Sequence, residues 1–210
     1  MYTLLYLAPQ PRDTNALDSR QDIQSIGYRL SQLGLQPALK VQEEINPRFV
    51  DLPFWLDRLT PQLVHFSGHG TNLAKLVFVD NQGNRHDVAP DAVASLFAAQ
   101  ATKVPVKGLI LNTCYALPVA KELVSSVDFV ISTGTEIQDQ SAIHFAETFY
   151  AQLVGESSSV EQAFLGARQR LAADPTQLDW ASMQLYSALE FHEGRPLTFR
   201  PYRGFLPFLP

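Results

Sequence analysis

Short apolar runs alternate along this chain with segments of helical periodicity, and this alternation limits the possible folds more than any other feature. The runs at residues 3–7, 63–66, 106–111 and 127–132 are typical of buried strands, and residues 38–45 alternate as a partly exposed strand would. The periodic segments predict helices at residues 16–33, 49–59, 90–99, 117–124, 141–153 and 157–172. Because each crossover must return to the same sheet, we expect an α/β domain with helices on both faces of a mostly parallel sheet.

Weaker signals complete this outline. An apolar run at residues 76–79 leads into the turn sequence DNQG, which predicts a hairpin arm. Asp13, Thr14 and Asn15 are available as N-caps for the first helix. Residues 183–189 can pair as a further strand, and the aromatic stretch after them is without periodicity and rich in proline. We therefore expect one domain at residues 1–190 and a Pro/aromatic-rich tail at 191–210.

The charge balance and the N-terminus exclude several classes of protein. The net charge of -5 comes from 21 acidic and 16 basic residues without a basic stripe, so we expect no direct nucleic-acid partner. The N-terminus lacks a basic region and meets Pro9 early, unlike a signal peptide. No apolar run reaches the roughly 18 residues of a membrane span. One cysteine allows no intrachain disulfide, so we expect a soluble cytoplasmic protein.

Two segments place reactive side chains directly after predicted strands. The first, LVHFSGHG at residues 63–70, ends with His69 and Gly70, and the second, GLILNTCY at residues 108–115, contains Cys114. Since parallel strands meet at one edge of a sheet, neighbouring strands would bring the imidazole and the thiol together. A histidine can take the proton of a thiol and return it to a leaving amine, as amide cleavage requires. The N–H groups of Gly70 and Cys114 would stabilise the oxyanion.

Simpler interpretations of these residues stay open. A lone cysteine is most often a small buried hydrophobic residue, and His69 can be a turn residue bonded to the backbone. His65 and His69 have a spacing that binds metals on helices, but Gly68 and Gly70 argue against a helix here. We therefore predict a structural role for His65, and neither a metal nor a cofactor.

Taken in order, the chain resembles the CHAT branch of the caspase-like cysteine peptidases, which includes relatives of separase and the metacaspases. The resemblance rests on the two segments above, on the opening YLAP strand, and on the stretches at residues 127–153 and 160–168, which end in FAETFYAQL and read VEQAFLGAR. It implies a three-layer α/β/α fold, with His69 as the base and Cys114 as the nucleophile. It also implies that Gly70 contributes its N–H to the oxyanion hole.

The resemblance also directs attention to the substrate pocket. Metacaspases hold a basic substrate residue with an aspartate two residues before the nucleophile, but this chain has Asn112 there, which places such a preference in doubt. Asp139 can supply a negative charge to the pocket, or it can cap the helix predicted from residue 141. Asn112 and Asp139 are therefore the two candidates for the substrate pocket.

Family resemblance and fold leave three hypotheses for function. The first is a cysteine endopeptidase that makes limited cleavages in a protein partner during a bacterial defence or stress response. Relatives are often fused to repeats or sensors, which implies an activating sensor or repeat protein as a further partner. The second is a catalytically silent interaction module with the same fold. The third, a flavodoxin-like small-molecule domain, is disfavoured because the sequence APQP at residues 8–11 replaces a glycine-rich phosphate loop.

Overall fold

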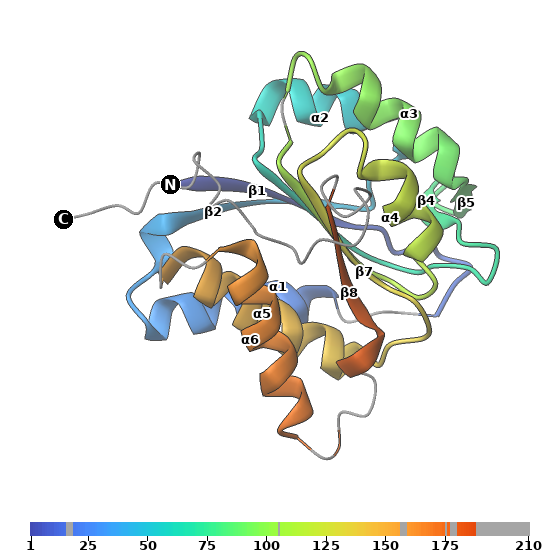
Figure 1. The fold of residues 1–210 in the computed structure, drawn as a ribbon. Helices are drawn as coiled ribbons and strands as arrows, with labels where there is room; N and C mark the ends of the chain where they lie inside the picture. The colour runs from blue at the N-terminus through green and yellow to red at the C-terminus, as the bar shows by residue number, and fades with distance from the viewer. Residues whose placement is uncertain (16–18, 105, 156–158, 175, 177–179, 188–210) are drawn as a thin grey trace, which may run out of the picture.

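A six-stranded sheet forms the centre of the molecule (Figure 1). The structure is a computed structural model and describes residues 1–15, 19–104, 106–155, 159–174, 176 and 180–187. In spatial order the strands are β2 (Leu39–Ile45), β1 (Tyr2–Ala8), β3 (Leu63–Ser67), β6 (Gly108–Asn112), β7 (Phe129–Thr133) and β8 (Met183–Ser187). All neighbours pair in parallel except β8, which runs antiparallel to β7.

Helices cover both faces of this sheet, as the sequence predicts. One face carries α2 (Leu52–Leu59), α3 (Pro90–Gln100) and α4 (Leu117–Leu123), and the other carries α1 (Ser19–Gln32), α5 (Asp139–Gly155) and α6 (Val160–Ala172) (Figure 1). The predicted three-layer α/β/α architecture with a mostly parallel sheet is therefore confirmed. Because helices cover both faces, β3 and β6 are buried along nearly their whole length.

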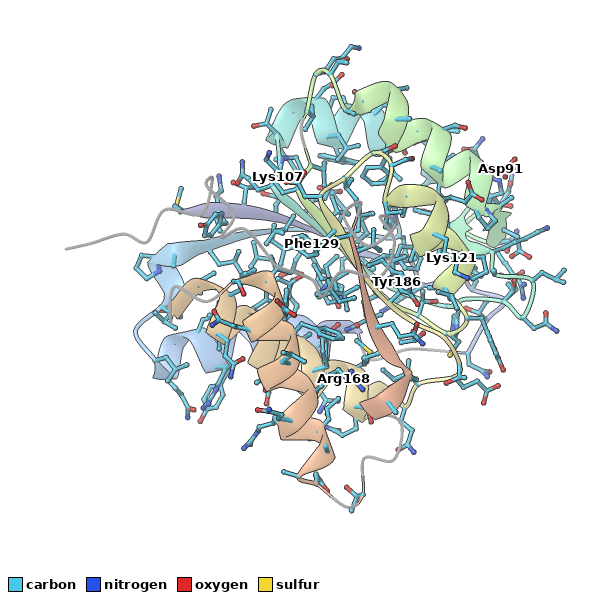
Figure 2. The ribbon with its side chains drawn as sticks, viewed as in Figure 1. Asp91, Lys107, Lys121, Phe129, Arg168 and Tyr186 are labelled. Carbon is cyan, nitrogen blue, oxygen red and sulfur yellow. The ribbon has the colours of Figure 1, made fainter. Side chains whose placement is uncertain are left out.

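The side chains follow the same layers. Lys121 of α4 and Asp91 of α3 lie on the outer side of one helical layer, and Arg168 of α6 lies in the opposite layer (Figure 2). Phe129 of β7 is buried between the sheet and the layer of α1, α5 and α6 (Figure 2). These three charged residues therefore lie on the helices outside the sheet, whereas the ring of Phe129 is buried against it.

A short antiparallel hairpin leaves the sheet after β3. It consists of β4 (Leu76–Val79) and β5 (Arg85–Val88), as the sequence predicts. Its turn is held by Asp80, whose carboxylate accepts the backbone N–H groups of Gln82 and Asn84 at 2.8 Å each. The hairpin follows His69 closely, so it fixes the chain just beyond that histidine.

Several predicted boundaries need correction. The helix predicted from residue 141 begins at Asp139. Asp13 accepts the Arg85 N–H, and the Thr14 hydroxyl donates to Pro11. The predicted capping of the first helix depends on residues 16–18, which lie outside the described residues. The predicted strand at 183–189 is β8 over residues 183–187, while residues 188–210, including the predicted tail, lie outside the described residues. No described helix is both long enough and apolar enough to cross a membrane.

Candidate active site

Two neighbouring strands bring His69 and Cys114 to one edge of the sheet. β3 and β6 pair in parallel, with Ser67 opposite Asn112, and each reactive residue follows two positions later. Both side chains line one pocket of about 80 Å³. This volume is well below that of a site for a whole small molecule, and it suits part of one side chain of a longer ligand. The predicted juxtaposition of imidazole and thiol therefore agrees with the fold.

Gly70 allows the two loops to meet. A Cβ atom at this position would overlap the carbonyl oxygen of Cys114 and crowd the Thr113 hydroxyl. Gly70 also forms an isolated antiparallel β-bridge with Leu76 of the hairpin. This bridge holds the loop after β3 close to Cys114. Any larger residue at position 70 would have to push Cys114 away, so the glycine is required by close approach of two backbones.

Among the described residues, the N–H groups of Gly70 and Cys114 have no hydrogen-bond partner. The bridge to Leu76 is flanked by hydrogen bonds from Val77 N–H to His69 and from Thr71 N–H to Lys75, which leaves the Gly70 N–H unused. Within the described part of the chain, no acceptor for either N–H is found. Two unused backbone donors beside a thiol are the groups an oxyanion needs.

A backbone carbonyl holds the ring of His69. Nε2 lies 2.7 Å from the carbonyl oxygen of Asn15, in the segment after β1. Because a carbonyl oxygen can only accept, Nε2 carries the proton, and Nδ1 of the neutral ring keeps a lone pair for another donor. The backbone of Asn15 therefore orients the histidine, which agrees with the simpler interpretation of His69 as a residue bonded to the backbone. The sequence does not indicate which residue is the partner.

The chain turns sharply after the thiol. Tyr115 has a φ of 56°, a left-handed conformation that costs a bulky residue about 1–2 kcal/mol. Its N–H donates to Thr135 at 3.3 Å, and its hydroxyl donates to Glu136 at 3.0 Å. These contacts tie the Cys114 loop to the segment that follows β7.

Both predicted pocket residues lie at this pocket. Asn112 is buried, and its side-chain amide donates to the carbonyl of Ala142 at 3.2 Å, while its Oδ1 has no partner within the described residues. Asp139 is exposed and is the first residue of α5, where its charge is favourable toward the helix dipole. Asp139 can therefore both stabilise the start of α5 and line the pocket.

The pocket also contains a carboxylate that the sequence reasoning missed. Asp22 of α1 lines it although the residue is only 2% exposed. Burial raises the pKa of Asp22 to about 6, and the hydrogen bond from the Tyr6 hydroxyl at 2.9 Å opposes this rise. A signal was present, because Asp22 shares the buried stripe of α1 with Ile26 and Leu30 at four-residue spacing.

His65 behaves as a residue of the interior. It is fully buried in β3, and its Nδ1 lies 3.0 Å from the hydroxyl of Tyr150. Burial lowers the pKa of His65 to about 3, so the ring is neutral near physiological pH. The described residues contain no group of three or more His, Cys, Asp or Glu side chains placed to hold a metal.

Comparisons with known sequences point to peptidases. No protein-family model matches the chain. A protein of Gillisia limnaea named a probable protease is 23% identical over 165 residues, covering 78% of this chain and 29% of that protein. A Roc-COR-CHAT protease from an unknown prokaryotic organism is 22% identical over 160 residues, covering 71% of this chain and 15% of that protein. The chain thus spans less than a third of either relative.

Comparisons with solved structures identify the fold. The Drosophila initiator caspase Dronc matches with a TM-score of 0.56 and 12% identity over 88% of this chain and 78% of its own. Caspase-1 of Spodoptera frugiperda matches with a TM-score of 0.55 and 15% identity over 88% and 85%. The Arg-specific cysteine proteinase gingipain R matches with a TM-score of 0.55 and 13% identity over 88% and 46%. The chain therefore has a caspase-like peptidase fold, and its narrower resemblance to the CHAT branch stays a prediction.

Proposed function

We propose that this chain is the peptidase domain of a cysteine endopeptidase in which Cys114 is the nucleophile and His69 transfers the proton. The observation that carries the proposal is the shared pocket. His69 and Cys114 follow paired strands and line one cavity, and the Asn15 carbonyl fixes the histidine tautomer that can accept a proton. The protease-named relatives and the caspase-like fold support the same reading.

The reaction follows from these groups. Nδ1 of His69 takes the proton from Sγ of Cys114, and the thiolate attacks the carbonyl carbon of the scissile amide. The carbonyl π electrons move to oxygen, and the N–H groups of Gly70 and Cys114 bind this oxyanion. As the C–N bond breaks, the imidazolium gives its proton to the leaving amine. Water then hydrolyses the thioester with His69 as the base, which regenerates the thiol.

The pocket favours a basic side chain before the scissile bond. Two carboxylates, Asp22 and Asp139, line it, and the described lining residues include neither Lys nor Arg. Near neutral pH the Asp22 carboxylate is mostly ionised, and no Lys or Arg of the described residues pairs with it. Hydrogen bonds, among them the one from Tyr6, stabilise this charge only in part, and a guanidinium or ammonium group of the substrate would neutralise it. Asp22 thus supplies the charge that Asn112 lacks.

We further propose that the substrate is a protein partner cut at one or a few positions, in a bacterial defence or stress response. The name of one relative, a Roc-COR-CHAT protease, supports control by further domains, so we propose an activating sensor or repeat protein as a second partner.

Thiol labelling tests the pair of reactive residues. Because Cys114 is the only cysteine, any alkylation by iodoacetamide reports on it alone, and Cys114→Ala serves as the blank. We expect His69→Ala to slow labelling at pH 7 more than tenfold, since an unactivated thiol is only a few per cent ionised there. Equal slow rates in the two proteins would contradict the proposed pair and would favour the silent interaction module.

Peptide amides test the pocket. We would compare fluorogenic tripeptide amides that differ only in the residue before the scissile bond, using Arg, Lys, Leu and Asp. Arg and Lys substrates should react best, and Asp22→Asn should lower kcat/KM for them about tenfold or more while Cys114 labelling stays fast. Asp139→Asn is the matched exposed control and should have a smaller effect. Preferred cleavage after Leu or Asp would refute the basic preference.

A further inference from the structure

Cys114 is confined by contacts on both of its neighbours in the chain. Before it, the carbonyl of Thr113 accepts the hydroxyl proton of Thr133. After it, Tyr115 donates its backbone N–H and its hydroxyl to the segment that follows β7. The backbone of Cys114 itself is pressed against Gly70. The backbone at Cys114 is therefore held between the histidine loop and residues 133–136.

The conformation of Tyr115 needs this support. A φ of 56° is rare for a residue with a bulky side chain, and such conformations persist only where surrounding contacts fix them. The contact that depends on the identity of the side chain is the hydrogen bond of 3.0 Å from the Tyr115 hydroxyl to Glu136. Removing the hydroxyl leaves the ring and the backbone bond in place, so it isolates this one contact.

We propose that Tyr115 is a positioning residue for the nucleophile, and that its hydrogen bond to Glu136 holds the turn that presents Cys114 to His69. This inference rests on the proposed function. The segment containing Glu136 continues directly to Ile137 and Asp139, which line the pocket. The same hydrogen bond therefore also connects the nucleophile loop to the wall of the substrate pocket.

The test measures the second-order rate of Cys114 alkylation by iodoacetamide in the full chain. Tyr115→Phe should lower this rate about fivefold at pH 7, the factor that corresponds to about 1 kcal/mol for one hydrogen bond. Glu136→Ala should have a similar effect. Glu136→Gln keeps a carbonyl acceptor and should retain at least about half of the wild-type rate.

A matched control removes a comparable hydrogen bond elsewhere. Tyr28 is 66% exposed on α1, and its hydroxyl is bonded to the side chain of Gln32 at 2.6 Å. Tyr28→Phe should label at the wild-type rate. Urea unfolding of each variant checks that labelling is measured on folded protein. Should Glu136→Ala fail to fold, Tyr115→Phe and Glu136→Gln still decide the question.

A double variant separates positioning from general loosening. If Tyr115 acts by aligning Cys114 with His69, Tyr115→Phe should have no further effect in a His69→Ala background. Three results would overturn the inference. Tyr115→Phe could label like Tyr28→Phe while His69→Ala is slow, which removes this inference alone. The fivefold loss of labelling rate on Tyr115→Phe could persist in the His69→Ala background, which also removes this inference alone. Equal rates in wild type and His69→Ala would remove both the proposed function and this inference.

Discussion

The two faces of the sheet bury different kinds of side chain. Toward α2, α3 and α4 the strands present apolar residues along their length, including Leu5, Leu7, Val64 and Phe66. Toward α1 and α5 the same strands begin apolar and become polar near their carboxyl ends, in the pairs Leu4 and Tyr6, Leu63 and His65, and Ile110 and Asn112. One face is therefore apolar along its length, whereas the polar end of the other leads to the pocket.

A truncation in the apolar face should affect stability and spare the site. Leu56 of α2 is fully buried in the cluster against this face. Leu56→Ala should lower the free energy of unfolding by about 3 kcal/mol, through lost transfer energy and the cavity left behind. Urea unfolding measures this loss, and alkylation of Cys114 in the folded variant should keep the wild-type rate. A slower rate would show that the two faces are coupled.

An added methyl group at the pocket edge should affect both the stability of the fold and the labelling of Cys114. Gly70→Ala forces the Cys114 loop to move, at a cost of about 2 kcal/mol in stability and a loss of tenfold or more in labelling rate. Gly27→Ala is the matched control, because Gly27 lies in α1 with open space around it. That control should gain up to about 1 kcal/mol from helix propensity. A Gly70→Ala protein with normal labelling would break the argument from close approach.

The buried His65, at the polar end of the second face, should make the stability of the fold depend on pH. The folded pKa of His65, about 3, lies below that of the unfolded chain, so its contribution is complete above about pH 6.5 and is lost as the pH falls. Replacing it with a residue that does not titrate removes this loss. From pH 7 to pH 5 the free energy of unfolding should fall by about 2 kcal/mol more in wild type than in His65→Gln, as measured by urea unfolding. An equal fall in the two proteins would indicate a charged His65 paired with Asp22, whose Oδ2 is 3.6 Å away.

Asp22 should make stability depend on pH in the opposite direction. Its folded pKa of about 6 lies above that of the unfolded chain, so its contribution is complete below about pH 4 and is lost as the pH rises through 6. An asparagine at position 22 does not titrate. From pH 5 to pH 7 the free energy of unfolding should therefore fall by about 1 kcal/mol more in wild type than in Asp22→Asn. The same unfolding experiment measures it. A change in the direction found for His65→Gln would contradict a raised pKa.

The smallest expected effect lies away from both regions. Ser159 caps α6, accepting the Gln162 N–H at 3.1 Å, while the Gln162 side chain accepts the Ser159 N–H at 2.9 Å. Ser159→Ala should cost about 1 kcal/mol of stability, as loss of a cap does, without a change in labelling. A change in labelling here would show that any destabilisation affects the thiol, and it would weaken the contrast between the two faces.

The order of strands and helices could be predicted because hydrophobic periodicity is a local property. The strand ends that carry His69 and Cys114 could be placed for the same reason, since each reactive residue directly follows an apolar run. The start of α5 was missed by two residues because Asp139 and Gln140 are polar and show no periodicity. Asp22 was missed because a single acidic residue in a helix is usually solvated, and only its shared stripe with Ile26 marks it as buried.

Contacts between distant segments could not be predicted in this way. The hydrogen bond from Tyr115 to Glu136 joins residues 21 positions apart, and the contact between His69 and Asn15 joins residues 54 positions apart. Neither leaves a pattern along the chain, because each depends on how separate loops meet after folding. The left-handed turn at Tyr115 is equally hidden, since a tyrosine gives no local preference for it.

His69 takes its orientation from a backbone oxygen, and every amino acid has one. A substitution that alters only the side chain at position 15 leaves that oxygen in place, so the histidine keeps its tautomer whichever residue stands there. Selection on this contact therefore acts on the path of the chain and not on the identity of the residue. Sequence drift at position 15 is silent for the imidazole, whereas an insertion or deletion between β1 and α1 is not.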